Sequence, residues 1–256
     1  MTDLFSIAGK TALVTGGSRG IGLMIARGYV ERGARVYISS RKKEACEAVA
    51  TELSEIGECY SLPADLGQMS EIERVAVALA ERESSLDILV NNAGATWGAT
   101  VDQFPESGWD KVLGLNAKAV FFLTQKLLPL LAKAASPETP ARVINVGSID
   151  GMHTSIFENY SYAASKAAVH HLTRVLAAHL AVRHITVNGI APGPFMTDMM
   201  APMVAKLGEA IVNRVPLKRM GLADDAVGIA TFLASKAANY ITGVVIPVDG
   251  GIMAAV

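Results

Sequence analysis

Tyr162 and Lys166 stand four residues apart in a segment with helical spacing, so their side chains project from one face of the helix. A free tyrosine has a pKa near 10 and is a poor acid or base at neutral pH, whereas a nearby ammonium group favours the phenolate. Lowering that pKa to near 7 requires roughly 4 kcal/mol of differential stabilisation, which a close, partly desolvated lysine can supply. The pair therefore predicts proton transfer at Tyr162, tuned by Lys166.

Two further polar residues support a catalytic interpretation of Tyr162 and Lys166. Ser148 lies at the end of a Val- and Ile-rich run just ahead of the tyrosine helix, where its hydroxyl can hold a carbonyl oxygen beside that of Tyr162. Asn116 interrupts an apolar helical stretch, and an interior amide needs partners. We expect a water-bridged link from Asn116 toward Lys166; the alternative is a solvent-facing amide. Tyr160 lacks a lysine four positions later and is expected to take no part in proton transfer.

A glycine-rich run from Gly16 to Gly22 follows the first apolar run and opens the first helix. Unpaired N–H groups and the helix dipole attract a pyrophosphate there, although glycines also simply terminate strands. The second strand ends at Ser40 without the Asp or Glu that binds the adenosine ribose in an NAD site. Arg19 and Arg41 can present paired donors to a 2′-phosphate, so we expect NADP(H). The alternative is two solvated surface arginines.

Two other strand ends carry candidate cofactor contacts. Asp65 follows a weak strand and either accepts a hydrogen bond from the adenine amino group or caps a helix. The segment Asn91-Asn92-Ala93-Gly94 ends the fourth strand, where small residues let a ribose approach and the amide side chains brace neighbouring loops. A purely structural turn is the alternative for this segment.

The elements that position these residues alternate along the chain. Short Val- and Ile-rich runs, with a weaker one at 58–62, occupy residues 11–15, 34–39, 86–91, 141–147, 184–191 and 243–248. Helical spacing occupies residues 20–32, 42–56, 69–83, 107–133 and 160–180. Apolar strands separated by helices predict an α/β fold, a doubly wound parallel sheet with its ligand site beyond the carboxyl ends of the strands.

One segment breaks this alternation. Residues 192–220 contain PGPFMTDMM and a Met-rich helical stretch, and we expect a substrate lid around 194–216. The apolar residues Phe195, Met196, Met199, Met200 and Met203 either cover an acyl chain or simply pack the lid.

The length, composition and charge of the chain limit the classes of protein to which it can belong. The chain has 256 residues, 51% of them hydrophobic and 18% charged, which predicts one folded domain over 1–256. A net charge of -1 gives no overall attraction to nucleic acid. No basic leader and no run of ~18 uncharged apolar residues is present, so we expect a cytoplasmic protein without a membrane span. Neither the two cysteines nor the five histidines show metal-ligand spacing, and no metal site is expected.

These motifs together resemble the short-chain dehydrogenase/reductase family over residues 1–251. The resemblance rests on Thr15-Gly16-x-x-x-Gly20-Ile21-Gly22, Asn91-Asn92-Ala93-Gly94, Asn116, Ser148, Tyr162-x-x-x-Lys166, Pro192-Gly193 and Asp249-Gly250-Gly251. It implies a single Rossmann-type domain, a catalytic set of Asn116, Ser148, Tyr162 and Lys166, and a homotetramer. The segments Ile190-Ala191-Pro192-Gly193 and Tyr240-Ile241-Thr242-Gly243 look most similar to the 3-oxoacyl-(acyl carrier protein) reductases. The turn from Ser136 to Arg142 and the stretch Ala95-Thr96-Trp97-Gly98 look similar to the rhamnolipid-associated type of that group.

The resemblance also implies roles for individual residues. Ser18, Arg19 and Ile21 would line the phosphates, and Thr197 would hold the nicotinamide carboxamide. The predicted cofactor contacts are Gly16, Ser18, Arg19, Gly20, Ile21, Gly22, Ser40, Arg41, Asp65, Leu66, Asn92, Ala93, Gly94, Tyr162, Lys166, Pro192, Gly193, Phe195 and Thr197. The chain departs from the family in having one additional residue between Ser148 and Tyr162, which predicts a bulged loop there.

The expected activity is NADPH-dependent reduction of a carbonyl, with a 3-oxoacyl thioester as the favoured substrate. The alternatives are a dehydrogenase acting on another secondary alcohol, such as a sugar, a steroid or the alcohol of a small ketone, and a dinucleotide-sensing protein without turnover. A sensor has no chemical need for all four polar residues of the catalytic set, and the fold alone does not separate these functions.

Overall fold

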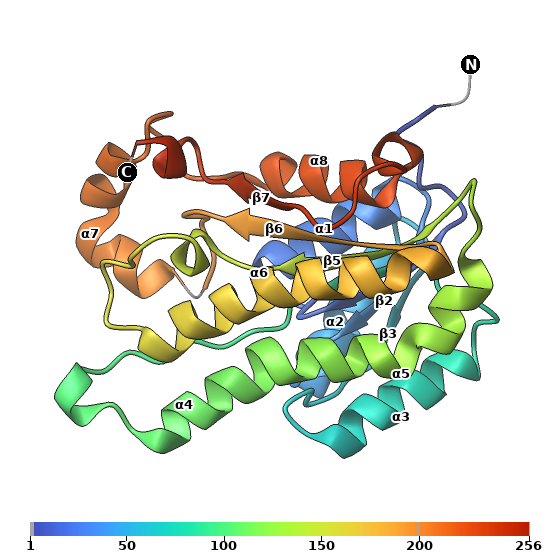
Figure 1. The fold of residues 1–256 in the computed structure, drawn as a ribbon, viewed down its shortest axis with the longest axis horizontal. Helices are drawn as coiled ribbons and strands as arrows, with labels where there is room; N and C mark the ends of the chain where they lie inside the picture. Colours follow the sequence, from blue (N-terminus) through green and yellow to red (C-terminus); the bar gives the residue numbers. More distant parts are fainter. Residues whose placement is uncertain (1–2, 199, 256) are drawn as a thin grey trace.

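Seven parallel strands form one sheet in the order β3-β2-β1-β4-β5-β6-β7 in the computed structural model, which describes residues 3–198 and 200–255 (Figure 1). The strands are β1 (Thr11–Thr15), β2 (Arg35–Ser39), β3 (Cys59–Ser61), β4 (Ile88–Asn91), β5 (Ala141–Val146), β6 (Ile185–Pro192) and β7 (Val245–Val248). The chain first winds outward from β1 to β3 and then crosses back to β4 on the other side of β1. This reversal confirms the doubly wound sheet and places a crevice between the ends of β1 and β4.

Helices cover both faces of the sheet (Figure 1). One face carries α1 (Gly20–Glu31), α2 (Lys43–Ser54) and α8 (Ala223–Ala234), and the other carries α3 (Met69–Ala80), α5 (Ala119–Ala134) and α6 (Tyr160–Leu180). Along β1, Ala12 and Val14 join the buried cluster on the first face, and Leu13 joins the cluster on the second. Because successive side chains alternate between two covered faces, the strand is apolar throughout.

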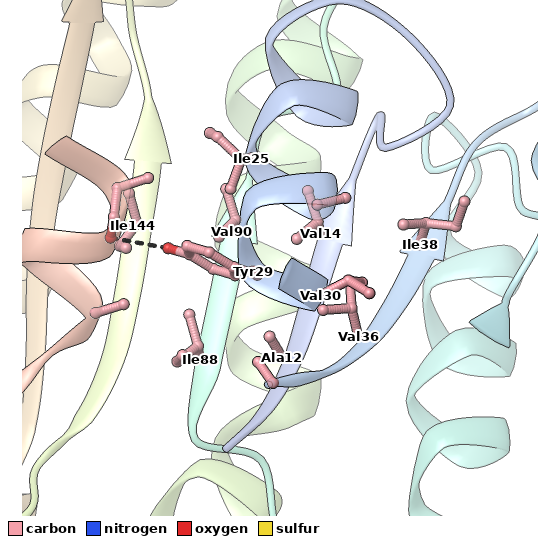
Figure 2. Close-up of a cluster of buried hydrophobic side chains, with 14 of the residues drawn as sticks. Ala12, Val14, Ile25, Tyr29, Val30, Val36, Ile38, Ile88, Val90 and Ile144 are labelled. Atoms are coloured by element: carbon pink, nitrogen blue, oxygen red, sulfur yellow. Dashed lines mark hydrogen bonds between the residues drawn. The ribbon is translucent and has the colours of Figure 1, made fainter. Parts of the chain in front are cut away.

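The core beneath α1 fixes the start of that helix at the end of β1. Figure 2 shows Ile25, Tyr29 and Val30 of α1 packed over neighbouring strands of the sheet. The Tyr29 ring is fully buried, and its hydroxyl donates a hydrogen bond of 2.9 Å to the Ala230 carbonyl oxygen in α8. Burial raises the pKa of this phenol, so it stays a neutral donor that ties the two helices together.

The predicted helix over 107–133 is wrong as a single element. The structure has α4 (Glu106–Leu113), a π-helical turn η2 (Gly114–Lys118) and α5 in succession. A π-helical turn accommodates an extra residue within a helix, and here it carries Asn116, whose side chain bonds to backbone outside the helix. The periodicity of apolar residues continues through the turn, so the pattern does not reveal the interruption. The other predicted ends differ from the observed bounds by small amounts, as helix ends and strand ends usually do.

Short single turns complete the chain between the main elements. They are η1 (Val101–Gln103), η3 (Ile149–Gly151), η4 (Ala181–Arg183), η5 (Lys236–Ala238) and η6 (Ile252–Ala254). In the region predicted to be a lid, α7 (Ala201–Arg214) contains a non-helical residue at Leu207. Across residues 3–198 and 200–255, no helix combines the length and the apolar character that a membrane crossing requires.

Candidate active site

The glycine-rich turn connects β1 to α1 through two glycines with positive φ, +66° at Gly16 and +54° at Gly20. A Cβ atom at Gly16 would lie 2.7 Å from Asn92 Nδ2, so a side chain there would push the turn away from β4. Arg19 precedes α1 with extended backbone and without a side-chain cap, and the first turn of α1 has no acidic residue. No side chain of that first turn therefore competes with an anion for the positive end of the α1 dipole, which fits a bound phosphate. Ser18 lies in the same turn, and Ile21 and Gly22 lie in the first turn of α1.

Asn92 braces the crevice between β1 and β4, as predicted. Its Nδ2 donates to the Thr15 carbonyl oxygen at 2.9 Å, and its backbone N–H donates to Thr15 Oγ1 at 2.9 Å. The Ala93 N–H shares that acceptor at 3.0 Å, while Thr15 Oγ1 itself donates to the Val90 carbonyl oxygen. Sequence reasoning missed this role of Thr15. A buried threonine at the last position of a strand is the signal that was available.

The end of β2 lies beside the end of β1, because Thr15 and Ser39 are in register. Ser40 and the exposed Arg41 follow β2 directly. Asp65 Oδ1 accepts a hydrogen bond of 3.2 Å from the Gly67 N–H. Because α3 begins only at Met69, the helix-cap alternative for Asp65 is wrong, and the carboxylate closes a local turn instead. The Leu66 side chain is buried in the core, so only its backbone can face a ligand.

Arg19 is paired across the crevice with the beginning of the predicted lid. Its guanidinium lies 3.8 Å from Asp198 Oδ2, and both side chains are mostly exposed. The neighbouring Thr197 also approaches the glycine-rich turn, since a Cβ atom at Gly20 would lie 3.3 Å from Thr197 Cγ2. The structure thus brings the start of the predicted lid against the glycine-rich turn, while the predicted cofactor contacts of Arg19 and Thr197 stay predictions. It adds a carboxylate that sequence reasoning did not consider.

Ser148 and Tyr162 come together at the carboxyl end of β5. Ser148 follows that strand and precedes η3, and its Oγ accepts a hydrogen bond of 3.2 Å from the Asp150 N–H. Tyr162 lies in the first turn of α6. Burial raises the pKa of the Tyr162 phenol to about 12, a hydrogen bond with Ser148 opposes the rise, and the Asp150 charge adds to it. The two hydroxyls therefore share one small region beside the crevice.

Lys166 lies over the ring of Tyr162. The ammonium nitrogen lies 5.4 Å from the ring centroid and donates a hydrogen bond of 2.8 Å to the Val146 carbonyl oxygen. Burial lowers the pKa of Lys166 to about 8. In the protein without a cofactor the pKa of Tyr162 is thus raised, because desolvation by burial is the largest influence on the phenol. A lowering of this pKa by Lys166 together with a bound nicotinamide ring stays a prediction.

Asn116 is buried and fully engaged, so the solvent-facing alternative is wrong. Its Oδ1 accepts from the Ala95 N–H at 2.8 Å, and its Nδ2 donates at 2.9 Å to the Ala95 carbonyl oxygen and to Ser165 Oγ. A Cβ atom at Gly94 would lie 3.3 Å from Asn116 Oδ1 and 3.7 Å from Lys166 Nζ. The missing side chain at Gly94 therefore leaves open space beside both groups, which fits an approaching ribose. The water-bridged link to Lys166 stays a prediction.

Ser165 is a second residue that sequence reasoning missed. Its hydroxyl accepts from Asn116 and donates to the Tyr162 carbonyl oxygen at 2.7 Å, so it joins the π-helical turn to α6. Tyr160, by contrast, packs its ring edge against Phe104 at 5.8 Å between centroids and donates to Glu158 at 3.3 Å. These contacts engage both the ring and the hydroxyl of Tyr160, as expected for a tyrosine outside the reacting set.

The end of β6 supplies the remaining predicted contacts. Pro192 is its last residue, and the Gly193 N–H donates to the Val248 carbonyl oxygen of β7 at 3.0 Å. Phe195 forms a β-bridge with Gly221 and its side chain is buried, so its backbone is the part that can meet a cofactor. Met196 is exposed. Met199 lies outside the described residues, as does the side chain of Met203.

Comparison with known proteins places this arrangement in a family. Residues 16–253 match the family described as enoyl-(acyl carrier protein) reductase. The rhamnolipids biosynthesis 3-oxoacyl-[acyl-carrier-protein] reductase of Pseudomonas aeruginosa is 49% identical over 253 residues, covering 98% of this chain and 99% of that protein. The 5-keto-D-gluconate 5-reductase of Escherichia coli strain K12 is 35% identical over 262 residues, with full coverage of both chains.

A solved structure shows the same relationship in three dimensions. The Pseudomonas aeruginosa RhlG/NADP active-site complex has a TM-score of 0.95 and 49% identity, and covers 98% of this chain and 99% of that chain. The matching fold, the strand-end motifs and the identity over nearly the whole length agree with one another. The chain belongs to the short-chain dehydrogenase/reductase family, which is a family of oxidoreductases.

Proposed function

We propose that the protein uses NADPH to reduce a carbonyl to a secondary alcohol, with a 3-oxoacyl thioester converted to the 3-hydroxyacyl form as the main reaction. The observation that carries this proposal is the convergence of Ser148, Tyr162 and Lys166 at the end of β5, beside the glycine-rich turn. The 3-oxoacyl reductase from Pseudomonas aeruginosa, 49% identical over nearly the whole chain, supports the substrate class.

Tyr162 is the proton donor in this proposal. A phenol whose pKa is raised to about 12 is fully protonated at neutral pH, which is the form that a donor to a carbonyl oxygen requires. Ser148 holds the same oxygen through its hydroxyl. As the proton leaves Tyr162, the ammonium form of Lys166 at 5.4 Å from the ring stabilises the phenolate that develops. Asn116 acts by fixing the Ala95 backbone and Ser165, and so the position of α6.

The residues around the crevice fit a dinucleotide phosphate. The glycine-rich turn and the open end of α1 suit the pyrophosphate, Arg19 and Arg41 suit a 2′-phosphate, and Gly94 leaves space for a ribose beside Lys166. NADPH, when bound, supplies the hydride that goes to the carbonyl carbon. The NADP-bound structure of a protein 49% identical to this chain supports the choice of cofactor.

A sugar alcohol is the second candidate substrate, because the Escherichia coli relative is a 5-keto-D-gluconate 5-reductase. The predicted lid around 194–216 favours an acyl chain instead. Met196 is 55% exposed and Leu207 is 47% exposed on this segment, and such apolar side chains gain more from covering a hydrocarbon than from covering a polyol.

A screen of NADPH consumption tests this proposal. The purified protein is offered 3-oxoacyl thioesters of several chain lengths, simple ketones, 5-keto-D-gluconate and keto steroids. We expect the highest kcat/KM with 3-oxoacyl thioesters. A higher kcat/KM with 5-keto-D-gluconate reassigns the substrate to the sugar class, and no turnover with any carbonyl compound favours the dinucleotide-sensing alternative.

The predicted homotetramer rests on apolar surface and on the family resemblance. Val175 on α6 and Phe121 on α5 are exposed, as is Tyr240 ahead of β7. A symmetric assembly would bury such side chains. Sedimentation equilibrium at micromolar concentration should give four times the mass of the chain, and a monomer would contradict the prediction. The expected cytoplasmic location also stays a prediction.

A further inference from the structure

His170 is a buried histidine in α6 that the proposed reaction does not use. It follows Tyr162 and Lys166 at intervals of four, so all three side chains lie along one face of the helix. Its side chain is almost completely buried, with 4% exposure. We propose that His170 is a positioning residue that holds Ser148 in place against the helix carrying Tyr162 and Lys166. Its effect on catalysis rests on the proposed function.

Both sides of the His170 imidazole contact the turn that begins at Ser148. The Ser148 N–H donates to His170 Nε2 at 3.4 Å. On its other side the ring lies against Gly151, where a Cβ atom would come within 3.0 Å of His170 Cε1. Between these two contacts lies η3 (Ile149–Gly151), the turn that sets the direction in which the chain leaves Ser148. The imidazole therefore bonds to the start of the turn and packs against its end.

Two glycines near Ser148 leave room for the His170 imidazole. A Cβ atom at Gly147 would overlap the His170 Nε2 atom, and it would lie 2.6 Å from Cδ2. A Cβ atom at Gly151 would lie 3.0 Å from His170 Cε1 and 2.6 Å from the Ala167 nitrogen. Two glycines, one on each side of the turn, thus leave the space that the imidazole fills. A leucine in place of His170 would fill similar space without offering an acceptor to the Ser148 N–H.

The neutral form of the ring is the form this contact requires, because Nε2 accepts a hydrogen bond only when it carries no proton. Burial, together with the positive charges of Lys166 and Arg174, lowers the pKa of His170 to about 4. The imidazole is therefore an acceptor throughout the neutral range, and its role is to hold the turn rather than to exchange protons.

The contact also holds Ser148 in place despite the additional residue between Ser148 and Tyr162. A longer loop leaves the distance between the two hydroxyls less constrained by the chain itself. His170 ties the start of this loop directly to α6, eight residues beyond Tyr162, so the Ser148 hydroxyl and the Tyr162 hydroxyl share one rigid support. The loop between Ser148 and Tyr162 can then vary without moving Ser148.

The first test measures how strongly the Ser148 amide is protected from hydrogen exchange, and it needs no substrate. Hydrogen exchange of the Ser148 amide is compared among the wild type, His170→Gln, His170→Leu and the control His171→Leu, in which the exposed neighbour is replaced. Gln can place an acceptor near the position of Nε2, whereas Leu cannot. We expect exchange to accelerate at least about tenfold in His170→Leu, the equivalent of one lost hydrogen bond. Exchange in His170→Gln and His171→Leu should stay near that of the wild type. Unchanged protection of Ser148 in His170→Leu overturns the proposal.

The second test asks whether the effect on catalysis passes through Ser148. His170→Leu should lower kcat about tenfold with an unchanged Kd for NADPH, and His170→Gln should restore most of the loss. In the Ser148→Ala background, the same His170→Leu change should alter kcat less than about twofold, because the group that His170 positions is gone. An undiminished tenfold loss in that background shows that His170 acts only on general structure, and overturns the proposal.

A third variant covers the case in which His170→Leu does not fold. Gly147→Ala places a methyl group where the imidazole lies, so it should expose the Ser148 amide to exchange while leaving the ring itself intact. Adding His170→Ala to Gly147→Ala should recover thermal stability but not the protection of Ser148. Normal protection in Gly147→Ala overturns the proposal. If the protein reduces no carbonyl, the proposed function fails, while the exchange measurements still decide the contact between His170 and Ser148.

Discussion

The two halves of the candidate site are built differently. On the catalytic side, Asn116, Ser148 and Lys166 are buried, and each makes a hydrogen bond to backbone. On the side proposed to bind the adenosine of the cofactor, here called the adenosine side, Arg19 and Arg41 are exposed, and the ion pair of Arg19 with Asp198 joins two mostly exposed side chains. Proton transfer needs groups fixed to within a fraction of an ångström, whereas recognition of a phosphate tolerates flexible donors.

This difference shows that the two sides of the candidate site affect the stability of the fold differently. Burying Lys166 without a carboxylate partner costs stability, as the drop of its pKa to about 8 shows, yet it places a cation beside Tyr162. The exposed arginines cost the fold little, and their contribution arises only when an anion binds. We therefore expect changes on the catalytic side to alter turnover and stability, and changes on the adenosine side to alter cofactor affinity.

The largest effect should come from Tyr162→Phe, which removes only a hydroxyl. We expect kcat to fall by about 10²–10⁴, because general acid catalysis contributes that much, while NADPH binding and folding persist. Tyr160→Phe is the matched control two residues away and should keep most of the activity. The measurement is carbonyl reduction at saturating NADPH. Collapse in Tyr160→Phe with near-normal kcat in Tyr162→Phe would show that the additional residue after Ser148 has shifted the catalytic register.

Lys166→Met tests the cost of burying a lysine. The native pKa of about 8 lies below the unfolded value of 10.5, so between these values the unfolded chain binds more protons and stability rises with pH. Lys166→Met should remove this rise, which amounts to at most about 3 kcal/mol. Near pH 7 the variant should be the more stable protein and nearly inactive. Urea unfolding at pH 7 and pH 9.5 checks this, and equal pH dependence in both proteins contradicts it.

Arg41→Ala should lower activity with NADPH and leave activity with NADH unchanged. A charge-assisted hydrogen bond to a 2′-phosphate contributes about 1.5–3 kcal/mol, so kcat/KM for NADPH should fall about tenfold or more while that for NADH stays unchanged. Steady-state kinetics with both cofactors at fixed ionic strength give the ratio. Equal losses with NADPH and NADH, or no loss with NADPH, would remove Arg41 from the site.

The smallest effect is expected at Asp198, the carboxylate that faces Arg19 at 3.8 Å. Exposed ion pairs contribute up to about 1 kcal/mol, so Asp198→Asn should strengthen NADPH binding by about two- to fivefold by freeing Arg19 for the phosphate. The gain should vanish near 0.5 M salt because added ions screen both interactions. Titration calorimetry at low and high salt measures it; weaker binding in Asp198→Asn would mean that the pair instead helps to close the segment over the cofactor.

The order of elements and the strand-end motifs were predictable because they depend on local pattern. Strands buried on both faces must be apolar throughout, and the turn from β1 to α1 needs glycine where φ is positive at Gly16 and Gly20. Tyr162 and Lys166 are neighbours by helical spacing alone. These features led from the sequence to the parallel sheet, to the family and to the residues of the candidate site.

Features that depend on contacts between distant segments were decided only by the tertiary structure. The π-helical turn at Asn116 forms because its amide finds the backbone of Ala95, 21 residues earlier, and apolar periodicity carries no trace of that partner. The pKa of Tyr162 rises because packing removes water from the phenol and the lysine together, whereas spacing predicted only their attraction. His170 could be identified only once the fold had brought it against Gly147, since desolvation and contact are properties of the packed chain.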